Sequence, residues 1–114
     1  MCIRDRVWVV NQVSDSVSIV DLTTRHVTAT LATDDEPADV LFAGMPERAY
    51  VSCSQTITIL VFDPDDLSLP PQRIDIAGEE PRALARSSDG SKVYCAIFES
   101  GNRSTVLGLS LIHI

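Results

Sequence analysis

Short apolar runs alternate with polar turn clusters along the whole chain. Runs rich in Val, Ile, Tyr and Phe that are bounded by Gly, Pro, Ser and Asp are typical of β-strands. Pro64, Pro70 and Pro71 exclude a long helix between residues 56 and 77, because proline cannot continue the helical hydrogen-bond pattern. The most regular stretch predicts four strands, near Asp39–Ala43, Glu47–Ser52, Thr56–Asp63 and Gln72–Ala77. The predicted fold class is therefore all-β.

The third of these strands carries apolar residues on both of its faces. Ile57, Ile59 and Val61 alternate with Leu60 and Phe62, whereas a strand with one face in water would alternate apolar with polar residues. Both faces are therefore expected to be covered, and sheets stacked on one another would provide that cover.

The pattern repeats along the chain with a period of 42 to 44 residues. Pro37 and Pro81 each follow a pair of acidic residues and begin an apolar strand, 44 residues apart. Residues of one chemical class also recur at equivalent positions: Trp8, Tyr50 and Tyr94 at one, and Asp21 and Asp63 at another. A four-stranded unit of this length that packs between copies of itself is typical of a β-propeller blade.

The two ends of the chain match each other at the level of DNA. Residues 1–6 back-translate to a string that is the reverse complement of one that encodes residues 109–114. This string resembles a transposase mosaic-end adapter used in preparing sequencing libraries. Both ends are therefore predicted to be adapter-derived artefacts that carry no information on fold or function. The alternative is an ordinary amino-terminal methionine and a hydrophobic final strand.

The residues between these ends divide into parts of three blades. Residues 7–36 are expected to supply the last three strands of one blade, residues 37–80 a complete blade, and residues 81–108 the start of the next. A propeller closes with about four to eight blades, so about two and a half blades would not close alone. The sequence is therefore predicted to be a β-propeller fragment. The remaining blades of its own full-length chain would be its first partners, covering its outer apolar faces.

One stretch of the chain carries the motifs of a known repeat. From Pro81 the sequence gives an apolar strand, then the turn residues Asp89 and Gly90, then a strand that contains Tyr94. In this order the elements resemble the YVTN family of β-propeller repeats, and the resemblance extends over nearly all of residues 7–108.

Other parts of the chain fit the same repeat to different degrees. Residues 8–11 and 17–24 match its second and third strands. The middle unit departs from the pattern, because residues 44–47 replace the Asp-Gly turn and residues 63–71 lengthen the third turn. These departures affect the strand register there and leave the blade count unchanged.

The resemblance implies a non-enzymatic scaffold that presents rim loops to a protein or a small ligand. It also implies a protein that is frequently exported, to the periplasm or the cell surface. One alternative is a fragment of a propeller enzyme, similar to lactonases or to haem- and quinone-dependent oxidoreductases, whose active-site residues lie outside this piece. Another is a propeller domain beside other domains of a larger exported protein. No catalytic, cofactor-binding or metal-binding residue is assigned within this piece.

Charge narrows the choice of partners. The net charge is −7 for the chain and −8 for residues 7–108, which argues against nucleic acid. No apolar run is long enough to span a membrane. The acidic residues on the predicted blade connections are candidates for a rim site that attracts cations or a basic partner: Asp34, Asp35, Glu36, Glu79 and Glu80. The alternative is solvated loop charge.

The other polar and reactive residues are expected to be structural. Cys53 and Cys95 are expected to be buried thiols, with a disulfide between adjacent blades as the alternative. His26 is expected on the surface, with a haem ligand or general base as the alternative. Asp21 and Asp63 are expected to accept backbone N–H bonds in the turns that follow them. The aromatic residues of the repeated position are expected to pack between blades and not to stack on bases.

Overall fold

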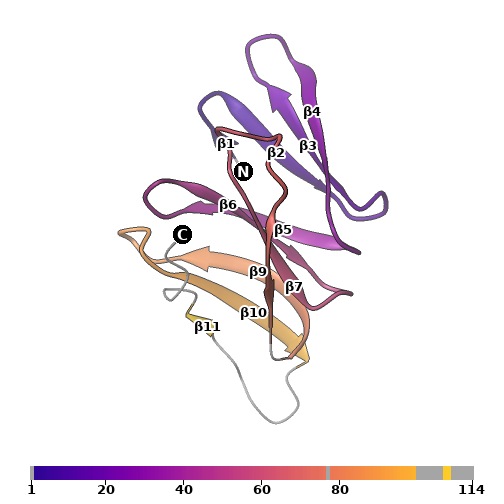
Figure 1. Ribbon diagram of the computed structural model, residues 1–114, viewed down its shortest axis with the longest axis vertical. Coiled ribbons are helices and arrows are strands. Elements are labelled where there is room, and N and C mark those ends of the chain that lie inside the picture. The colour runs from indigo at the N-terminus through magenta and orange to yellow at the C-terminus, as the bar shows by residue number, and fades with distance from the viewer. Residues whose placement is uncertain (1, 77, 100–106, 109–114) are drawn as a thin grey trace.

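The computed structural model describes residues 2–76, 78–99 and 107–108, and within these residues the regular structure consists of strands alone (Figure 1). The strands are β1 (Cys2–Ile3), β2 (Arg6–Asn11), β3 (Ser16–Asp21), β4 (His26–Ala32), β5 (Pro37–Ala43), β6 (Arg48–Cys53), β7 (Thr58–Phe62), β8 (Gln72–Asp75), β9 (Glu79–Arg86), β10 (Val93–Glu99) and β11 (Leu107–Gly108). The prediction of an all-β fold is confirmed.

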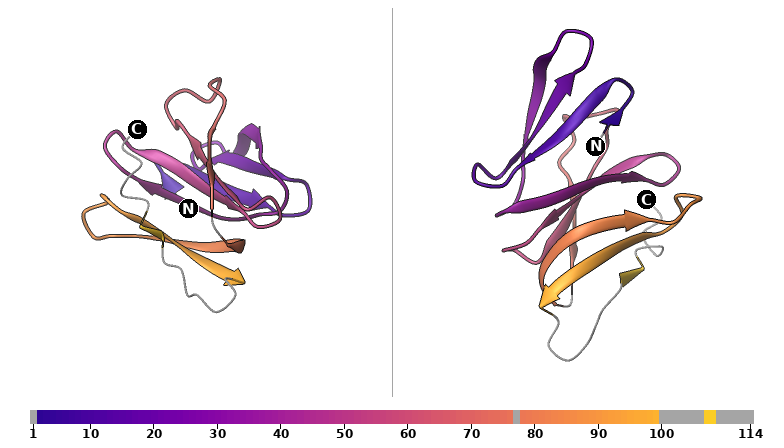
Figure 2. Two further views of the ribbon diagram at one scale, coloured as in Figure 1. Left: turned by 60° about the horizontal axis from the view of Figure 1, so that its bottom comes forward. Right: turned by 180° about the vertical axis from the view of Figure 1, so that it is seen from behind.

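Three antiparallel sheets follow one another along the chain. The first sheet has the order β1-β2-β3-β4, the middle sheet β5-β6-β7-β8, and the last sheet β11-β10-β9. Figures 1 and 2 show the sheets succeeding one another along the long axis of the molecule, each built from a continuous stretch of chain. This is the arrangement predicted for consecutive propeller blades.

The four predicted strands of the middle sheet are confirmed, with shifts at their ends. The third strand begins at Thr58 and not at residue 56, because Ile57 has a left-handed backbone (φ 58°) that belongs to the turn before it. The fourth ends at Asp75, and residue 77 lies outside the described residues. In the last sheet, the predicted Asp-Gly turn is confirmed by Gly90, whose φ of 74° is one that glycine adopts freely.

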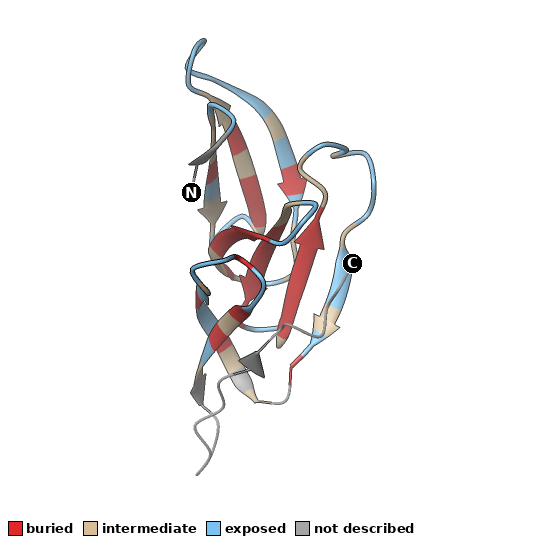
Figure 3. Cartoon of the chain, turned by 90° about the vertical axis from the view of Figure 1, so that its left-hand side faces the viewer, coloured by how far each residue is buried: buried red, intermediate tan, exposed pale blue. Residues whose placement is uncertain are grey.

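Two apolar cores separate the three sheets. The first core lies between the first and middle sheets and contains Trp8, Val17, Ile19, Leu31, Val40, Phe42, Ala49, Val51, Cys53, Leu60 and Phe62. The second lies between the middle and last sheets and contains Leu41, Ala43, Tyr50, Ile59, Val61, Ile76, Leu84, Val93 and Cys95. Alternate residues of β5, β6 and β7 thus enter opposite cores. The prediction that both faces of this sheet are covered is confirmed, and Figure 3 shows the buried segments gathered in its strands.

The repeated aromatic position points from each sheet toward the next. The Trp8 ring lies 5.4 Å from Phe42 and 6.3 Å from Phe62 between ring centroids, in edge-to-face contacts within the first core. Tyr50 enters the second core in the same way, and its burial raises the pKa of the phenol. Packing between sheets is confirmed for these two residues. Tyr94 is half-buried on the far face of the last sheet.

The ends of the chain take part in the sheets to different extents. Cys2–Ile3 pair with Arg6 and Val7, so that the first sheet contains a short fourth strand beyond the three predicted for residues 7–36. At the other end, Leu107 and Gly108 pair with β10, and residues 109–114 lie outside the described residues. The adapter origin of both ends stays a prediction.

Candidate functional site

The predicted acidic residues differ in where they lie. Asp34, Asp35 and Glu36 join β4 to β5, as expected for a connection, whereas Glu79 and Glu80 are the first residues of strand β9. The prediction of a connection is therefore wrong for Glu79 and Glu80, although the two groups hold equivalent positions in the sequence repeat. The first group connects the first sheet to the middle sheet, and the second group begins the last sheet.

The residue before each repeated proline has the same unusual backbone. Glu36 and Glu80 both have a φ of 55°, and Pro37 and Pro81 after them are fully buried. Non-glycine residues in this region are uncommon and need support from their surroundings. Because this conformation recurs before both repeated prolines, it is a structural feature of the repeat.

Backbone hydrogen bonds supply that support at Glu36. Its N–H donates to the Asp15 carboxylate (3.0 Å), which projects from the β2–β3 turn. Its carbonyl accepts bonds from the Ser54 N–H (3.0 Å) and the Ser54 hydroxyl (3.2 Å), in the β6–β7 turn. The connection is thereby tied to both sheets that it joins. The repeat pattern does not reveal Asp15 as a site residue, since the equivalent position in the next repeat is Ile57.

Asp34 is committed to contacts within the fold. Its carboxylate forms an ion pair with Arg73 of β8 and accepts a hydrogen bond from the Thr58 hydroxyl (3.0 Å) of β7. The hydrogen bond from Arg73 and the negative charge of Asp34 raise the pKa of the guanidinium. With 11% of its side chain exposed, Asp34 links the connection to the outer strands of the middle sheet.

Asp35 is the exposed member of its group. Partial desolvation raises the pKa of its carboxyl, and the negative charges of Asp15 and Glu36 raise it further. In β9, Glu80 lies 3.6 Å from the Arg82 guanidinium. Among Asp34, Asp35, Glu36 and Glu80, Asp35 is therefore the acidic residue best placed to meet a cation from solvent. Within the described residues, no group of three or more His, Cys, Asp or Glu is arranged to hold a metal ion.

The repeated aspartates at the ends of the third strands shape turns, as predicted. Asp21 Oδ1 accepts hydrogen bonds from the backbone N–H groups of Thr23 (2.7 Å) and Thr24 (3.3 Å). Asp63 Oδ1 accepts one from the N–H of Asp65 (2.9 Å). The backbone bonds lower the pKa of Asp21, because they stabilise the charged carboxylate.

An arginine meets each of these aspartates from the neighbouring strand. Arg6 lies 3.2 Å from Asp21, and Arg48 lies 3.5 Å from Asp63. The two pairs hold positions 42 residues apart, and Arg6 falls within residues 1–6, the segment predicted to be adapter-derived. His26, directly across the strand pair from Asp21, is exposed as predicted.

The two cysteines are buried free thiols, as predicted. Neither has measurable exposure, and burial raises the pKa of each thiol to about 11. Cys53 lies in the first core and Cys95 in the second, so the middle sheet separates them and the alternative of a disulfide between them is wrong. At neutral pH both thiols are protonated and therefore poor nucleophiles.

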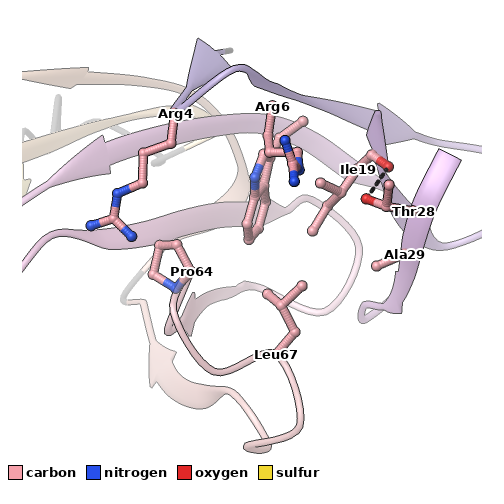
Figure 4. A pocket seen from close by; sticks show the side chains of 8 residues that line it. Arg4, Arg6, Ile19, Thr28, Ala29, Pro64 and Leu67 are labelled. Carbon is pink, nitrogen blue, oxygen red and sulfur yellow. Dashed lines mark hydrogen bonds between the residues drawn. The ribbon is translucent and has the colours of Figure 1, made fainter. Parts of the chain in front are cut away.

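A pocket of about 330 Å³ lies between the first sheet and the long β7–β8 loop. Figure 4 shows Pro64 and Leu67 of that loop facing Ile19, Thr28 and Ala29, with the two arginines of its lining nearby. Its volume is within the range of small-ligand pockets. The lengthened loop is evident in the sequence, but the sequence pattern does not predict this pocket.

The charged lining of this pocket comes from the start of the chain. Arg4 forms an ion pair with Asp65, and Arg6 pairs with Asp21. Both arginines fall within residues 1–6, the segment predicted to be adapter-derived. Thr28, a further polar residue of the lining, donates its hydroxyl to the Ile19 carbonyl (3.3 Å). The pocket is thus a gap beneath the β7–β8 loop. The polar side chains of its lining, Arg4, Arg6 and Thr28, already bond to other groups of the chain.

Comparison with known proteins supports the fold. No family model matches this chain, and no curated protein matches it. Among solved structures, it is similar to Kuenenia stuttgartiensis hydrazine synthase, with a TM-score of 0.74 and 25% sequence identity. The similarity covers 82% of this chain and 26% of that chain, so this chain spans about a quarter of its neighbour. Together with the stacked antiparallel sheets, it identifies the chain as a β-propeller fragment.

The described residues also bear on a membrane partner. Across residues 2–76, 78–99 and 107–108, no helix has the length and apolar character needed to cross a bilayer.

Proposed function

We propose that this chain is a run of YVTN-type repeat blades in a non-enzymatic scaffold, which presents its rim loops to a protein or a small ligand. The observation that supports this most directly is the repetition of its turn and backbone features. Asp21 and Asp63 each hold the turn after an equivalent strand, and Glu36 and Glu80 share a left-handed backbone before a buried proline. A residue that serves every blade alike is suited to building the propeller, whereas an active site occurs once.

The rim with the acidic connections is the proposed binding surface. Asp35 is exposed there, beside the β2–β3 turn that contributes Asp15, and its carboxyl already experiences the negative charge of its neighbours. A cation or a basic side chain would relieve that repulsion. Surface loops carried by a rigid scaffold are common sites of binding.

A titration with an oligolysine peptide tests this surface. Asp35→Asn is expected to weaken binding severalfold, and the matched variant Asp65→Asn, at a different turn and with the same change of charge, is expected to leave it unchanged. Equal weakening by both variants would show that net charge alone governs binding, and this would remove the rim from the proposal.

Recovery of the flanking DNA tests the scaffold as a whole. We expect further blades with the same repeated residues, a signal sequence for export to the periplasm or the cell surface, and no cluster of His or acidic residues on loops that face the central channel. Such a cluster would overturn the scaffold and favour an enzyme. Genuine coding sequence in place of the adapter string would overturn the predicted origin of residues 1–6 and 109–114.

A propeller enzyme is the second candidate, and one observation favours it. The similar solved structure is named a synthase, so a propeller segment of this shape occurs in an enzyme. For this chain the residues of such a site would come from other blades, as in lactonase-like or haem- and quinone-dependent propellers. The sequence of the flanking DNA separates the two candidates directly.

A further inference from the structure

Two departures from the repeat meet at the pocket beneath the β7–β8 loop. The first is the loop itself, which spans residues 63–71, whereas the equivalent turn between β3 and β4 spans residues 22–25. The second is a shift of register between β3 and β4, while the described pairs of the equivalent strands β7 and β8 are in continuous register. Features that blades share build the fold, so irregular features that meet at one place indicate a local function.

The register shift is a β-bulge that directs one additional side chain into the pocket. Ile19 pairs with Ala29 and Val20 with Val27, so Thr28 is left out of the pairing. Neighbouring residues of a regular strand point to opposite faces, but here both Thr28 and Ala29 line the pocket. The Thr28 hydroxyl donates to the Ile19 carbonyl (3.3 Å), and its oxygen can still accept a hydrogen bond from a ligand.

The loop on the other side of the pocket is braced by its own hydrogen bonds. The Asp63 carbonyl accepts a bond from the Asp66 N–H (3.2 Å), and Asp66 Oδ1 accepts one from the Ser68 N–H (3.2 Å). This loop places Pro64 and Leu67 opposite the first sheet (Figure 4), and Leu67 also packs against the first core. The wall of the pocket is therefore formed before a ligand arrives, which lowers the entropic cost of binding.

We propose that this pocket binds a small, uncharged aromatic compound that carries one hydrogen-bond donor. Five of its eight lining residues are apolar or aromatic, and its volume of about 330 Å³ is sufficient for a ligand of about two fused rings. The five are Trp8, Ile19, Ala29, Pro64 and Leu67. The Thr28 hydroxyl would accept the bond from the donor of the ligand.

The charged residues of the lining do not determine this ligand. Arg4 and Arg6 are held in ion pairs with Asp65 and Asp21, and an uncharged compound leaves both pairs in place. The other six lining residues lie outside residues 1–6, so the proposed site is not made by the segment predicted to be adapter-derived. The pocket is also separate from the acidic connection, and the inference is independent of the proposed rim function.

A titration with 2-naphthol, followed by NMR, tests the site. Trp8 is the single tryptophan of the chain and lines the pocket, so its indole N–H signal reports occupancy directly. We expect this signal to shift and to saturate. 2-Methoxynaphthalene has the same rings without the donor and is expected to bind about fivefold more weakly, as for one neutral hydrogen bond. A Trp8 signal that 2-naphthol leaves unchanged would overturn the proposal.

Thr28→Val tests the contact with the donor. Valine keeps the branched shape of threonine and removes the hydroxyl. The variant is expected to bind 2-naphthol about fivefold more weakly than the unmodified chain does, and to bind 2-methoxynaphthalene with unchanged affinity. Equal weakening of both compounds, or of neither, would contradict the proposal.

Two leucines of the same loop provide a matched pair of variants. Leu67→Ala removes part of the pocket wall and is expected to weaken the binding of both compounds about tenfold. Leu69→Ala, at a residue that is 50% exposed and lines a different pocket, is expected to leave both affinities unchanged. Far-UV circular dichroism checks that each variant remains folded. Equal effects of the two variants would overturn the proposal.

Arg4→Ala tests whether the site is independent of residues 1–6. The variant is expected to bind both compounds as the unmodified chain does. Loss of binding would show that the predicted adapter segment makes the pocket, and this result would also overturn the proposal.

Discussion

The middle sheet and the two outer sheets are built from equivalent residues, yet they are buried to different degrees. Val51 has no measurable exposure in the middle sheet, whereas Val9 at the same repeat position of the first sheet is 42% exposed. The strands pair in the same antiparallel order in each case. Burial in this fold therefore depends on a neighbouring sheet on each side, and a single repeat contains only half of each core that it helps to form.

The largest expected effect on stability is at the repeated aromatic position. Trp8→Ala removes a ring that packs on Phe42 and Phe62 in the first core, and we expect a loss of about 3–5 kcal/mol in the free energy of unfolding. Tyr94→Ala, at the equivalent position on the face of the last sheet that no other described sheet covers, is expected to cost less than about 1 kcal/mol. Urea unfolding at low protein concentration measures both losses. Equal losses would mean that Tyr94 is covered after all.

A smaller test compares two valines at one position of the repeat. Val51→Ala leaves a cavity in the first core and is expected to cost about 2 kcal/mol. Val9→Ala, on the face of the first sheet that no other described sheet covers, is expected to change the free energy of unfolding by about 0.5 kcal/mol or less. The two substitutions remove the same atoms from the same kind of strand, so the difference between their unfolding free energies measures the stacked sheet alone. A difference near zero would contradict the comparison.

A third test concerns the polar contact that links the middle sheet to the last sheet. The Asp39 carboxylate accepts a hydrogen bond from the backbone N–H of Leu84 (2.8 Å). Asp39→Ala leaves this partly buried N–H without its acceptor and is expected to cost about 1–2 kcal/mol, measured by urea unfolding.

The repeat offers a control for this substitution. Ala83 is equivalent to Asp39 and is exposed on the face of the last sheet that points away from the middle sheet. Because no further described sheet presents an N–H to it, Ala83→Asp is expected to add no stability. A clear gain from Ala83→Asp would indicate a bonding partner beyond this face.

Much of the fold could be predicted because the same pattern of apolar strands and prolines occurs more than once in the sequence. Pro37 is the first residue of β5, Pro81 lies two residues after the start of β9, and the apolar residues on both faces of β7 require two neighbouring sheets. Strand ends were harder, since Ile57 reads as a strand residue by its type. Its left-handed backbone comes from the turn geometry that Asp15 shares at the equivalent position (φ 53°), and a β-branched residue gives no local signal for it.

The contacts at the candidate site followed less from the sequence. The acidic residues of the connections were found from their recurrence, but the partners of Asp34 were not. Arg73 lies 39 residues away in the chain, and no equivalent pair recurs among the described residues to reveal it. Long-range polar pairs that occur once depend on how two sheets are placed in space, which a periodic pattern does not specify. Repetition therefore predicts the stacked sheets better than the polar contacts of the connections.

The smallest expected effect on stability is at the β9–β10 turn, and it tests whether the last sheet depends on its own turn. Asp89 accepts hydrogen bonds from the Ser91 N–H (3.0 Å) and from the hydroxyls of Ser87 (2.7 Å) and Ser91 (2.8 Å), and these lower the pKa of its carboxyl from 3.8 to about 2. Since the folded pKa is depressed, the carboxylate stabilises the fold above about pH 4 and loses this effect as the pH falls toward 2.

Asp89→Ala is accordingly expected to lower the Tm at pH 7, and the difference from the unmodified chain should narrow between pH 4 and pH 2. Hydrogen exchange should place the loss in the β9–β10 hairpin, because the middle sheet has residues 44–47 and no equivalent Asp-Gly turn at the matching place. Asp89→Asn separates charge from geometry, since the amide oxygen still accepts a hydrogen bond but does not titrate. A difference between Asp89→Ala and the unmodified chain that stays constant down to pH 2 would show that the turn is stabilised by shape alone and not by the ionised carboxylate.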